Sequence, residues 1–398
     1  MSLDPISREY LDISFAIERH FPGFIDAYFG PPEIKTAAEA RGLMPPVTLA
    51  DRSQALARAV AASDYPASRQ TFLAAQLRAM TTICRTLSGE RIAYLDEVAA
   101  CFDIEPEFTP ESRFDDAIKE LNAILPGSGD VRERMIAWRA RYAVKPDVAR
   151  MLVDAIVPEV RRRTEAFVTM PAGEGVEIAF VTNKPWSGYN WYLGGYQSRI
   201  DVNQDQTIHA NELTGLIAHE TYPGHHAEHA LKELSLYRNR GYGEHTIQLI
   251  NTPECVISEG IATMAESIIF PDGEGPRWQA EAVFPLAGIV GEPARESAIV
   301  RALAAQRAVQ ANAAIMLHER QASESQVVAY LSQYRLRTEG ESRHSLSFIA
   351  DPLWRPYVFT YSVGRQLLTD RFAPLDQAER QRAFAGLLVE QTTPAAFT

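Results

Sequence analysis

The chain has few cysteines, and their spacing fits neither a disulfide framework nor a thiolate metal site. Only three occur among 398 residues, at Cys84, Cys101 and Cys255, and no two of them form a C-x-x-C pair. An odd number of widely separated cysteines is typical of free thiols in a reducing compartment. We therefore expect buried free thiols and a cytoplasmic protein.

Long apolar segments and nucleotide-binding loops are also missing. The sequence has no run of about 18 apolar residues that could span a membrane, and no basic segment followed by an apolar core at its start. It contains neither a glycine-rich phosphate loop nor G-x-S-x-G, and no internal repeat or low-complexity linker. A net charge of −12 argues against nucleic acid or an anionic membrane surface as a partner. We expect a small or cationic partner; the oligomeric state stays open.

Helical periodicity dominates the first part of the chain. Apolar residues recur at helical spacing from Ile6 to Ile17, before Phe21-Pro22-Gly23 ends the run. Further helices are predicted at about 51–62, 68–87, 91–102, 111–124, 130–143 and 146–168. From residue 175 the period changes to 2, and segments 189–193 and 196–203 flank Gly194-Gly195 as in a β-hairpin. The pattern predicts a mainly α protein with a small hairpin or sheet.

Histidine is concentrated in one stretch of the chain. Six of the nine histidines lie between residues 209 and 245, and Glu220 directly follows His219 at the end of an apolar helical run. A His-Glu pair of this kind opens the H-E-x-x-H zinc motif, in which the second histidine lies one helical turn on. Here that position holds Pro223. The strict motif is therefore broken.

Pro223-Gly224 is followed by two adjacent histidines. Proline lacks a donor N–H and glycine tolerates positive φ, so the pair predicts the end of the helix or a kink. If the helix unwinds there, the turn can return His225 to the metal. If it continues, His226 faces the same way as His219, about 10 Å further along the axis. We favour His225 as the ligand and keep His226 as the alternative.

These residues resemble a large bacterial family of predicted zinc peptidases of uncharacterised function. The likeness rests on H-E-T-Y-P-G-H-H at 219–226 and on S-E-G-I-A-T-M-A-E at 258–266, with weaker similarity near both ends of the chain. The family is distantly similar to the helical gluzincins, such as thermostable carboxypeptidases and oligopeptidases. The resemblance implies a large helical fold in which a small sheet precedes the metal helix.

The resemblance also implies roles for individual residues. Glu259 matches the third zinc ligand, and Glu266 would orient a ligand histidine from behind. Tyr361, in a late Y-S-V-G-R segment, matches the family pattern and would stabilise an oxyanion. The remaining candidates for orienting ligands or binding substrate are His229, Arg343, His344, Arg365 and Tyr192. The two arginines could bind a substrate carboxylate, and the hairpin could hold an extended peptide or merely brace the metal helix.

We therefore expect one large domain over residues 1–398, with a helical lobe at 1–170 and a lobe with the sheet and the metal helix at 171–398. The expected activity is zinc-dependent hydrolysis of amide bonds in short peptides, with Glu220 as general base for a metal-activated water. One alternative is a hydrolase of non-peptide amides. Another is a helical scaffold or binding protein without turnover. Fe(II), Mn(II) or Co(II) would also suit two histidines and a carboxylate.

Overall fold

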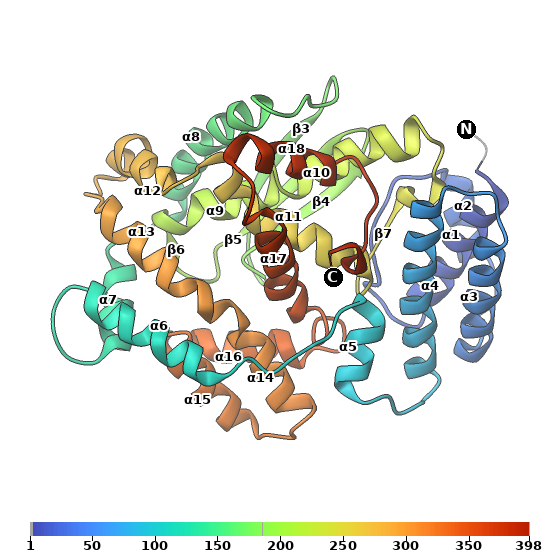
Figure 1. The fold of residues 1–398 in the computed structure, drawn as a ribbon, viewed down its shortest axis with the longest axis horizontal. Coiled ribbons are helices and arrows are strands. Elements are labelled where there is room, and N and C mark those ends of the chain that lie inside the picture. Colours follow the sequence, from blue (N-terminus) through green and yellow to red (C-terminus); the bar gives the residue numbers. More distant parts are fainter. Residues whose placement is uncertain (1–2, 185, 398) are drawn as a thin grey trace.

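The computed structural model describes residues 3–184 and 186–397, and these form a mainly α-helical fold with small sheets, as expected (Figure 1). The helices are α1 (Pro5–Glu18), α2 (Pro32–Glu39), α3 (Pro46–Ala61), α4 (Ala67–Leu87), α5 (Tyr94–Phe102), α6 (Glu111–Ile124), α7 (Val131–Ala140), α8 (Pro146–Glu165), α9 (Ala210–Glu220), α10 (His225–Lys232), α11 (Pro253–Ile269), α12 (Glu274–Trp278), α13 (Pro293–Ala302), α14 (Val309–His318), α15 (Glu324–Tyr334), α16 (Glu339–Ala350), α17 (Val358–Phe372) and α18 (Gln377–Leu387). The strands are β1 (Ile25–Tyr28), β2 (Ala143–Val144), β3 (Gly175–Val181), β4 (Gly188–Gly194), β5 (Gln197–Asn203), β6 (Ile208–His209) and β7 (Ile247–Leu249). Short π- and 3-10 segments are η1 (Glu233–Arg238), η2 (Gly243–Thr246), η3 (Gln279–Val283), η4 (Phe284–Ala287), η5 (Leu303–Ala308) and η6 (Pro394–Ala396).

Helices α1 to α4 lie together at one end of the molecule (Figure 1). Asp4 caps α1 by accepting a hydrogen bond of 2.9 Å from the backbone N–H of Ser7, and Pro5 occupies the first turn, where its missing N–H is not needed. The apolar residues that predicted this helix, including Tyr10 and Ile13, are buried. Local capping and the apolar stripe together explain why the chain is helical here.

Residues 175–203 form a three-stranded sheet of order β3-β5-β4. Strands β4 and β5 are the predicted antiparallel hairpin, and β3 runs parallel to β5. Within the described chain β4 pairs with β5 alone, so its outer edge is open in the sense that no strand pairs with it, although β1 packs near β4. Two smaller pairs, β1 with β7 and β2 with β6, join segments far apart in sequence.

The two largest hydrophobic clusters both cross the lobe boundary predicted at residue 170. One joins residues 3–114 with 237–359, and the other joins 121–160 with 202–336. The segments on either side of residue 170 therefore share their cores. The division into two lobes itself stays a prediction.

Helices α11 and α17 lie against each other at the centre of the molecule (Figure 1). A Cβ atom on Gly260 would lie 2.7 Å from the carbonyl oxygen of Gly364, and a Cβ atom on Gly364 would lie 2.1 Å from the carbonyl oxygen of Val256. Neither position accepts a side chain, because backbone atoms cannot move aside. The two glycines thus allow the close packing that brings α17 next to Glu259.

Two further expectations concern the cysteines and membrane-spanning helices. Cys84, Cys101 and Cys255 are buried free thiols, as expected. Among the described residues, no helix combines the length and the apolar character that crossing a bilayer demands.

The cap of α1 generates a stability prediction for Asp4→Asn, which removes the charge but keeps a good capping residue. Burial acts to raise the pKa of Asp4, but hydrogen bonds from Tyr65, Ser7 and Arg69 outweigh it and hold the pKa at about 2. The variant should lose about 1 kcal/mol of unfolding free energy at pH 7, allowing for the partial exposure of the carboxylate.

Because the folded pKa of Asp4 lies below the value of 3.8 for the free side chain, this stabilisation is complete above pH 5 and is lost as the pH falls towards 2. Urea unfolding at pH 7 and pH 3 measures the difference between variant and parent. Asp64→Asn is the matched control, since Asp64 is exposed and its side chain has no partner in the part of the chain that the structure describes. An equal loss of unfolding free energy at pH 7 and pH 3 would contradict the lowered pKa of Asp4.

Candidate metal centre

Helix α9 ends directly after Glu220, as the Pro-Gly pair predicted. The Thr221 N–H donates to the carbonyl of Ile217 at 2.8 Å, and the Gly224 N–H donates to the carbonyl of Ala218 at 3.1 Å, which folds the chain back on the helix end. A Cβ atom on Gly224 would lie 1.9 Å from the carbonyl oxygen of His219, so only glycine fits. The next helix, α10, then begins at His225.

This turn brings three side chains together. His219 from α9, His225 from α10 and Glu259 from α11 each offer one ligand atom, and these atoms all lie within 4.8 Å of one another. His219 Nε2 lies 3.5 Å from Glu259 Oε2, and His225 Nε2 lies 3.8 Å from Glu259 Oε1. The two imidazole rings stand edge to face with centroids 4.8 Å apart. The two histidines therefore face the same carboxylate from two helices.

His226, the alternative ligand, lies outside this cluster. Its Nδ1 is 2.8 Å from Ser198 Oγ on β5, and its Nε2 is 2.8 Å from Glu174 Oε2. Glu174 also accepts a hydrogen bond of 2.6 Å from the hydroxyl of Tyr222. Both ring nitrogens of His226 are thus engaged on the far side of α10, where the ring joins the helix to the sheet.

The protonation of the cluster suits a divalent cation. Burial lowers the pKa of His219 well below its usual value and that of His225 to about 4, so both imidazoles are neutral and have a free lone pair. Burial raises the pKa of Glu259 to about 8, against the hydrogen bond from Tyr357, and Glu259 Oε2 is buried without a hydrogen-bond partner. A buried carboxylate oxygen in this position lacks a positive partner, which a metal ion would supply. Two neutral imidazoles and one carboxylate are a donor set that Zn²⁺ accepts.

Tyr357 and Ser258 hold the ligands in place. The Tyr357 hydroxyl donates to Glu259 Oε1 at 2.8 Å. Ser258 Oγ donates to Glu228 Oε2 at 2.5 Å and lies 3.1 Å from His225 Nδ1. Because the single hydroxyl proton of Ser258 goes to Glu228, His225 Nδ1 must be the donor in the second contact. This tautomer leaves the lone pair of His225 on Nε2, facing Glu259.

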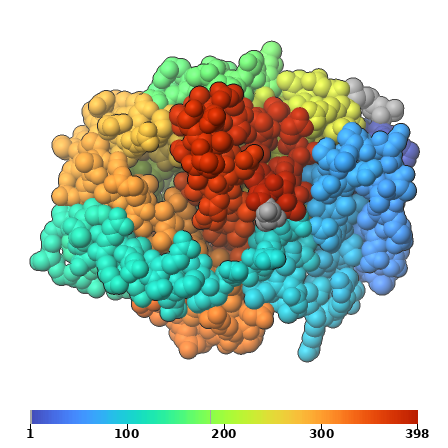
Figure 2. All heavy atoms as spheres, in the orientation of Figure 1, coloured from blue at the N-terminus to red at the C-terminus, as the bar shows by residue number. Residues whose placement is uncertain are grey.

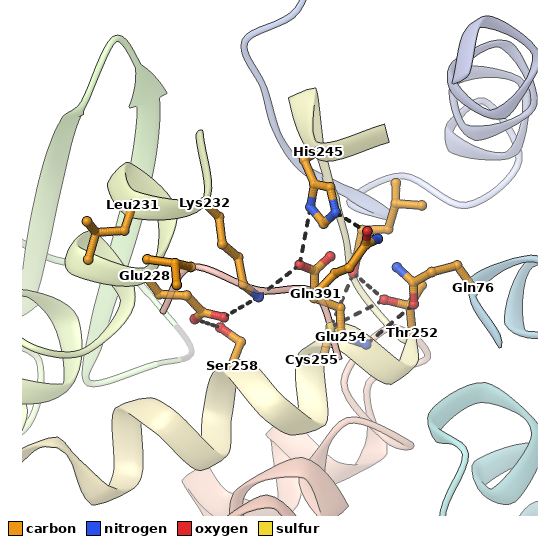
Figure 3. A network of polar contacts seen from close by, with 12 residues as sticks. Gln76, Glu228, Leu231, Lys232, His245, Thr252, Glu254, Cys255, Ser258 and Gln391 are labelled. Carbon is orange, nitrogen blue, oxygen red and sulfur yellow. Dashed lines mark hydrogen bonds and ion pairs between the residues drawn. The ribbon is translucent and has the colours of Figure 1, made fainter. Parts of the chain in front are cut away.

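A chain of buried polar groups continues from Glu228 (Figure 3). Lys232 Nζ donates to Glu228 Oε1 at 2.7 Å and to Glu254 Oε1 at 3.2 Å. His245 Nδ1 lies 3.8 Å from the same Glu254 oxygen, and His245 Nε2 lies 3.3 Å from Gln391 Nε2. The carboxylate that fixes Ser258 is therefore itself fixed by a lysine between two acids.

Glu220 lies beside the ligand set rather than within it. Its Oε1 is 3.9 Å from His219 Nε2, and its side chain is buried. Burial, and then the charges of Glu259 and Asp26, raise the pKa of Glu220 well above its usual value. Asp26 of β1 accepts a hydrogen bond from the Tyr189 hydroxyl, and burial raises its pKa to about 6. Two further carboxyl groups, those of Glu220 and Asp26, thus lie close to the carboxylate of Glu259.

A cleft of about 120 Å³ opens onto the centre. It is lined by the cluster, Glu220, His229 and Tyr361, and by Trp186 and Tyr189 next to and on the open edge strand β4. The His229 ring stacks on that of His225 with centroids 5.8 Å apart. Of the candidates from sequence, His229 and Tyr361 therefore lie in the cleft with the ligands.

The other candidates lie elsewhere. Glu266 is two turns beyond Glu259, about 10 Å along α11, and it lies against Gly215 of α9, so Ser258 and not Glu266 contacts a ligand histidine. Arg365 donates to the backbone carbonyl of Thr263 and lines a separate cavity with Glu266.

Arg343 and Tyr192 do not line the cleft, although the Tyr192 ring lies beside that of His229, with centroids 5.4 Å apart. Arg343 is exposed and pairs with Glu339 at 2.6 Å. Tyr192 is buried, and its hydroxyl donates to Glu233 at 2.6 Å. His344 is half-buried in a cavity that adjoins the cleft.

Sequence reasoning assigned no role to Asp26, Glu228, Ser258 or Tyr357. Ser258 directly precedes Glu259, and Glu228 follows His225 by one turn, which are usable local signals. For Asp26 the sequence offered no local signal, because only the pairing of β1 with β7 brings this residue to the site.

Comparisons with protein-family models and with curated proteins find no match to this chain. Among solved structures, the chain is similar to a protein described as "putative lipoprotein" from Colwellia psychrerythraea, with 16% identity, a TM-score of 0.54, and coverage of 92% of this chain and 71% of the other. A second structure, described as "putative lipoprotein of unknown function" from Shewanella oneidensis, has 12% identity, a TM-score of 0.49, and coverage of 96% and 83%. At such identity the first likeness concerns the fold alone.

The geometry predicts that His225, and not His226, is needed for metal binding. Protein purified without chelator or nickel affinity should carry about one zinc per chain by elemental analysis, whereas His219→Ala, His225→Ala and Glu259→Ala should carry little. His226→Ala should lose stability, because the buried Glu174 and Ser198 each lose one hydrogen-bond partner, but should keep its zinc. Metal lost from His226→Ala and kept by His225→Ala would reverse the assignment.

The contact between Ser258 and His225 predicts a weaker metal site in Ser258→Ala. Without the hydroxyl, His225 Nδ1 loses its acceptor, and zinc affinity should fall about 10- to 100-fold. Competition with a chromophoric chelator measures the affinity. Ser347→Ala, an exposed serine on α16, is the control and should match the parent. Unchanged affinity in Ser258→Ala would mean that the hydrogen bond does not orient the ring.

Proposed function

We propose that this protein is a zinc-dependent hydrolase that cleaves amide bonds of short peptides. The observation that carries the proposal is the convergence of His219, His225 and Glu259 in a cleft that also holds the Glu220 carboxylate. When bound, zinc would polarise a scissile carbonyl and lower the pKa of a water molecule. The resemblance of the motif to helical zinc peptidases points to the same class of reaction.

Glu220 is the proposed general base. Its carboxylate is adjacent to His219 but outside the ligand set, so it is free to accept a proton. In the reaction it takes the proton of the attacking water and then donates it to the leaving amine. Its burial beside the cleft excludes competing water from this exchange.

Tyr361 is the proposed donor to the oxyanion that forms on the scissile carbonyl. Burial, and then the charges of Glu259 and Glu220, raise the pKa of Tyr361 well above its usual value, so its phenol stays protonated. Its ring lies near that of Tyr357, with centroids 5.7 Å apart. Tyr357 already donates its hydroxyl to Glu259, which leaves Tyr361 as the phenol available to a substrate.

The open edge of β4 supports a peptide as substrate. Gly188, Tyr189 and Asn190 of this strand line the cleft, and an extended peptide can add to such an edge through backbone hydrogen bonds. A Cβ atom on Gly188 would lie 3.0 Å from Glu220 Oε1, so the strand backbone passes directly over the base. A peptide aligned on β4 would have its carbonyl groups beside Glu220. The three free thiols further support a reducing location such as the cytoplasm.

The test is hydrolysis of a mixed peptide library, followed by mass spectrometry, for the parent and Glu220→Gln. The variant should keep its zinc but lose activity by about 100- to 10,000-fold, because it cannot accept the proton of water. Glu281→Gln removes the same charge from an exposed side chain and should behave as the parent.

Each alternative has its own outcome in this experiment. Turnover of non-peptide amides but of no peptide would assign the same site to a different substrate class. Bound zinc without turnover of either class would favour a helical scaffold or binding protein. No bound zinc in the parent would refute the metallohydrolase.

A further inference from the structure

A second cavity, of about 620 Å³, lies away from the metal cleft. Its walls come from α11 and α17 on one side and from the segment 271–303 on the other. In the space-filling view the surface is hollowed between the orange helices α12 and α13 and the red C-terminal helices (Figure 2). We call this the basic cavity.

The basic cavity is positively charged in a protein of net charge −12. Seven arginines line it against four carboxylates. The carboxylates are Glu212, Glu266, Asp272 and Glu296. An excess of arginine on one concave surface of an acidic protein favours anions locally, whatever the overall charge.

Most of these arginines have no carboxylate partner. No ion pair is found in the described part of the chain for Arg301, Arg307, Arg365 and Arg380. Arg335 likewise has no ion pair, but it donates to Ser345 Oγ at 3.0 Å. By contrast, Arg139 pairs with Glu341 at 2.7 Å and with Glu212 at 3.0 Å. The unpaired guanidinium groups keep their donors available to a ligand.

Arg365 is the least compensated of the four. Burial, and then the charge of Arg307, lower its pKa to about 9, although Glu266 acts in the opposite direction. Arg307 is exposed at its outer part, but desolvation by the surrounding protein lowers its pKa as well. Two neighbouring cations therefore share the single carboxylate of Glu266, and a bound anion would relieve their repulsion.

A third cavity lies between the basic cavity and the metal cleft and has wall residues in common with both. It shares Glu212 and Arg335 with the basic cavity, and shares His219, Glu220 and Tyr361 with the metal cleft. Glu259 and Glu266 lie about 10 Å apart along α11. An extended peptide covers this distance with about three residues.

We propose that the basic cavity binds an anionic group through its unpaired arginines, and that in a peptide substrate this group is a carboxylate about three residues from the scissile bond. Guanidinium groups bind carboxylate and oxyanions through two parallel hydrogen bonds, which provides both charge and orientation. The first part of the proposal is independent of catalysis, whereas the second rests on the proposed function. Acidic peptides are then the preferred substrates.

The first experiment tests the cavity alone, with sulfate as the probe. Calorimetric titration of the full-length parent at constant ionic strength should give saturable binding, which Arg307→Gln and Arg301→Gln each weaken at least about tenfold. Both side chains are exposed, so their loss leaves the core intact. Arg343→Gln removes an exposed arginine outside the cavity and should bind sulfate as the parent does. No sulfate binding, or binding equal in all four proteins, would overturn the proposal, even if peptide hydrolysis is found.

The second experiment identifies the source of the anion. Glu220→Gln is titrated with Ala-Ala-Ala-Glu-Glu and with its neutral analogue Ala-Ala-Ala-Gln-Gln-amide, with and without sulfate. At least tenfold tighter binding of the acidic peptide, lost with Arg307→Gln and competed by sulfate, would support a substrate carboxylate in the cavity. Sulfate binding without competition would overturn the substrate part and assign the cavity to a free anion. Absence of hydrolysis in the parent would refute the proposed function without affecting either binding result.

Discussion

The candidate metal centre depends on one close backbone contact, between Gly224 and the carbonyl of His219. Because glycine has no Cβ atom to collide with that carbonyl oxygen, the chain can leave α9 and start α10 within four residues. The turn directs His225 back towards His219 and turns the adjacent His226 to the opposite side of α10. A conventional H-E-x-x-H helix places its two histidines by helical periodicity alone. Here His225 is brought next to His219 because the helix ends. His225 then faces Glu259, whereas His226 contacts Ser198 and Glu174.

The second half of the centre comes from helix packing. Glu259 reaches the histidines because α11 crosses behind them, and its carboxylate is held by Tyr357 at the start of α17. The glycine contact between Gly260 and Gly364 allows α17 to lie this close. The consequence is a concentration of buried carboxyl groups with raised pKa values around Glu259. Such a group of acids is costly without a cation, which is the electrostatic argument for a metal ion.

Charges of opposite sign gather around two different spaces of the molecule. The metal cleft is lined by Asp26, Glu220 and Glu259, whereas the basic cavity is lined by several arginines without an ion pair in the described chain. Tyr361 and Arg365 stand one turn apart on α17 and face different spaces. Groups proposed for bond cleavage and groups proposed for anion binding therefore lie at successive levels of the same two helices, α11 and α17.

Short-range sequence patterns predicted much of the secondary structure and part of the candidate site. The apolar stripe of α1, the hairpin of residues 188–203 and the helix end at Pro223-Gly224 follow from neighbours within a few positions. His219 was a candidate because Glu220 directly follows it, whereas Glu259 was a candidate through the resemblance of its motif. Turn chemistry and helical periodicity act over short distances and can be read directly.

Only the tertiary structure decided which groups meet across the chain. Sequence could not separate His225 from His226, because the choice depends on Ser198 of β5 and on Glu174. It assigned Glu266 and Arg365 to the metal histidines and the substrate carboxylate, whereas packing joined both in the basic cavity. It had no means to bring Asp26 to Glu220, since the two are 194 positions apart and meet through strand pairing. Long-range contacts of this kind are set by the packing of whole elements, which no local periodicity records.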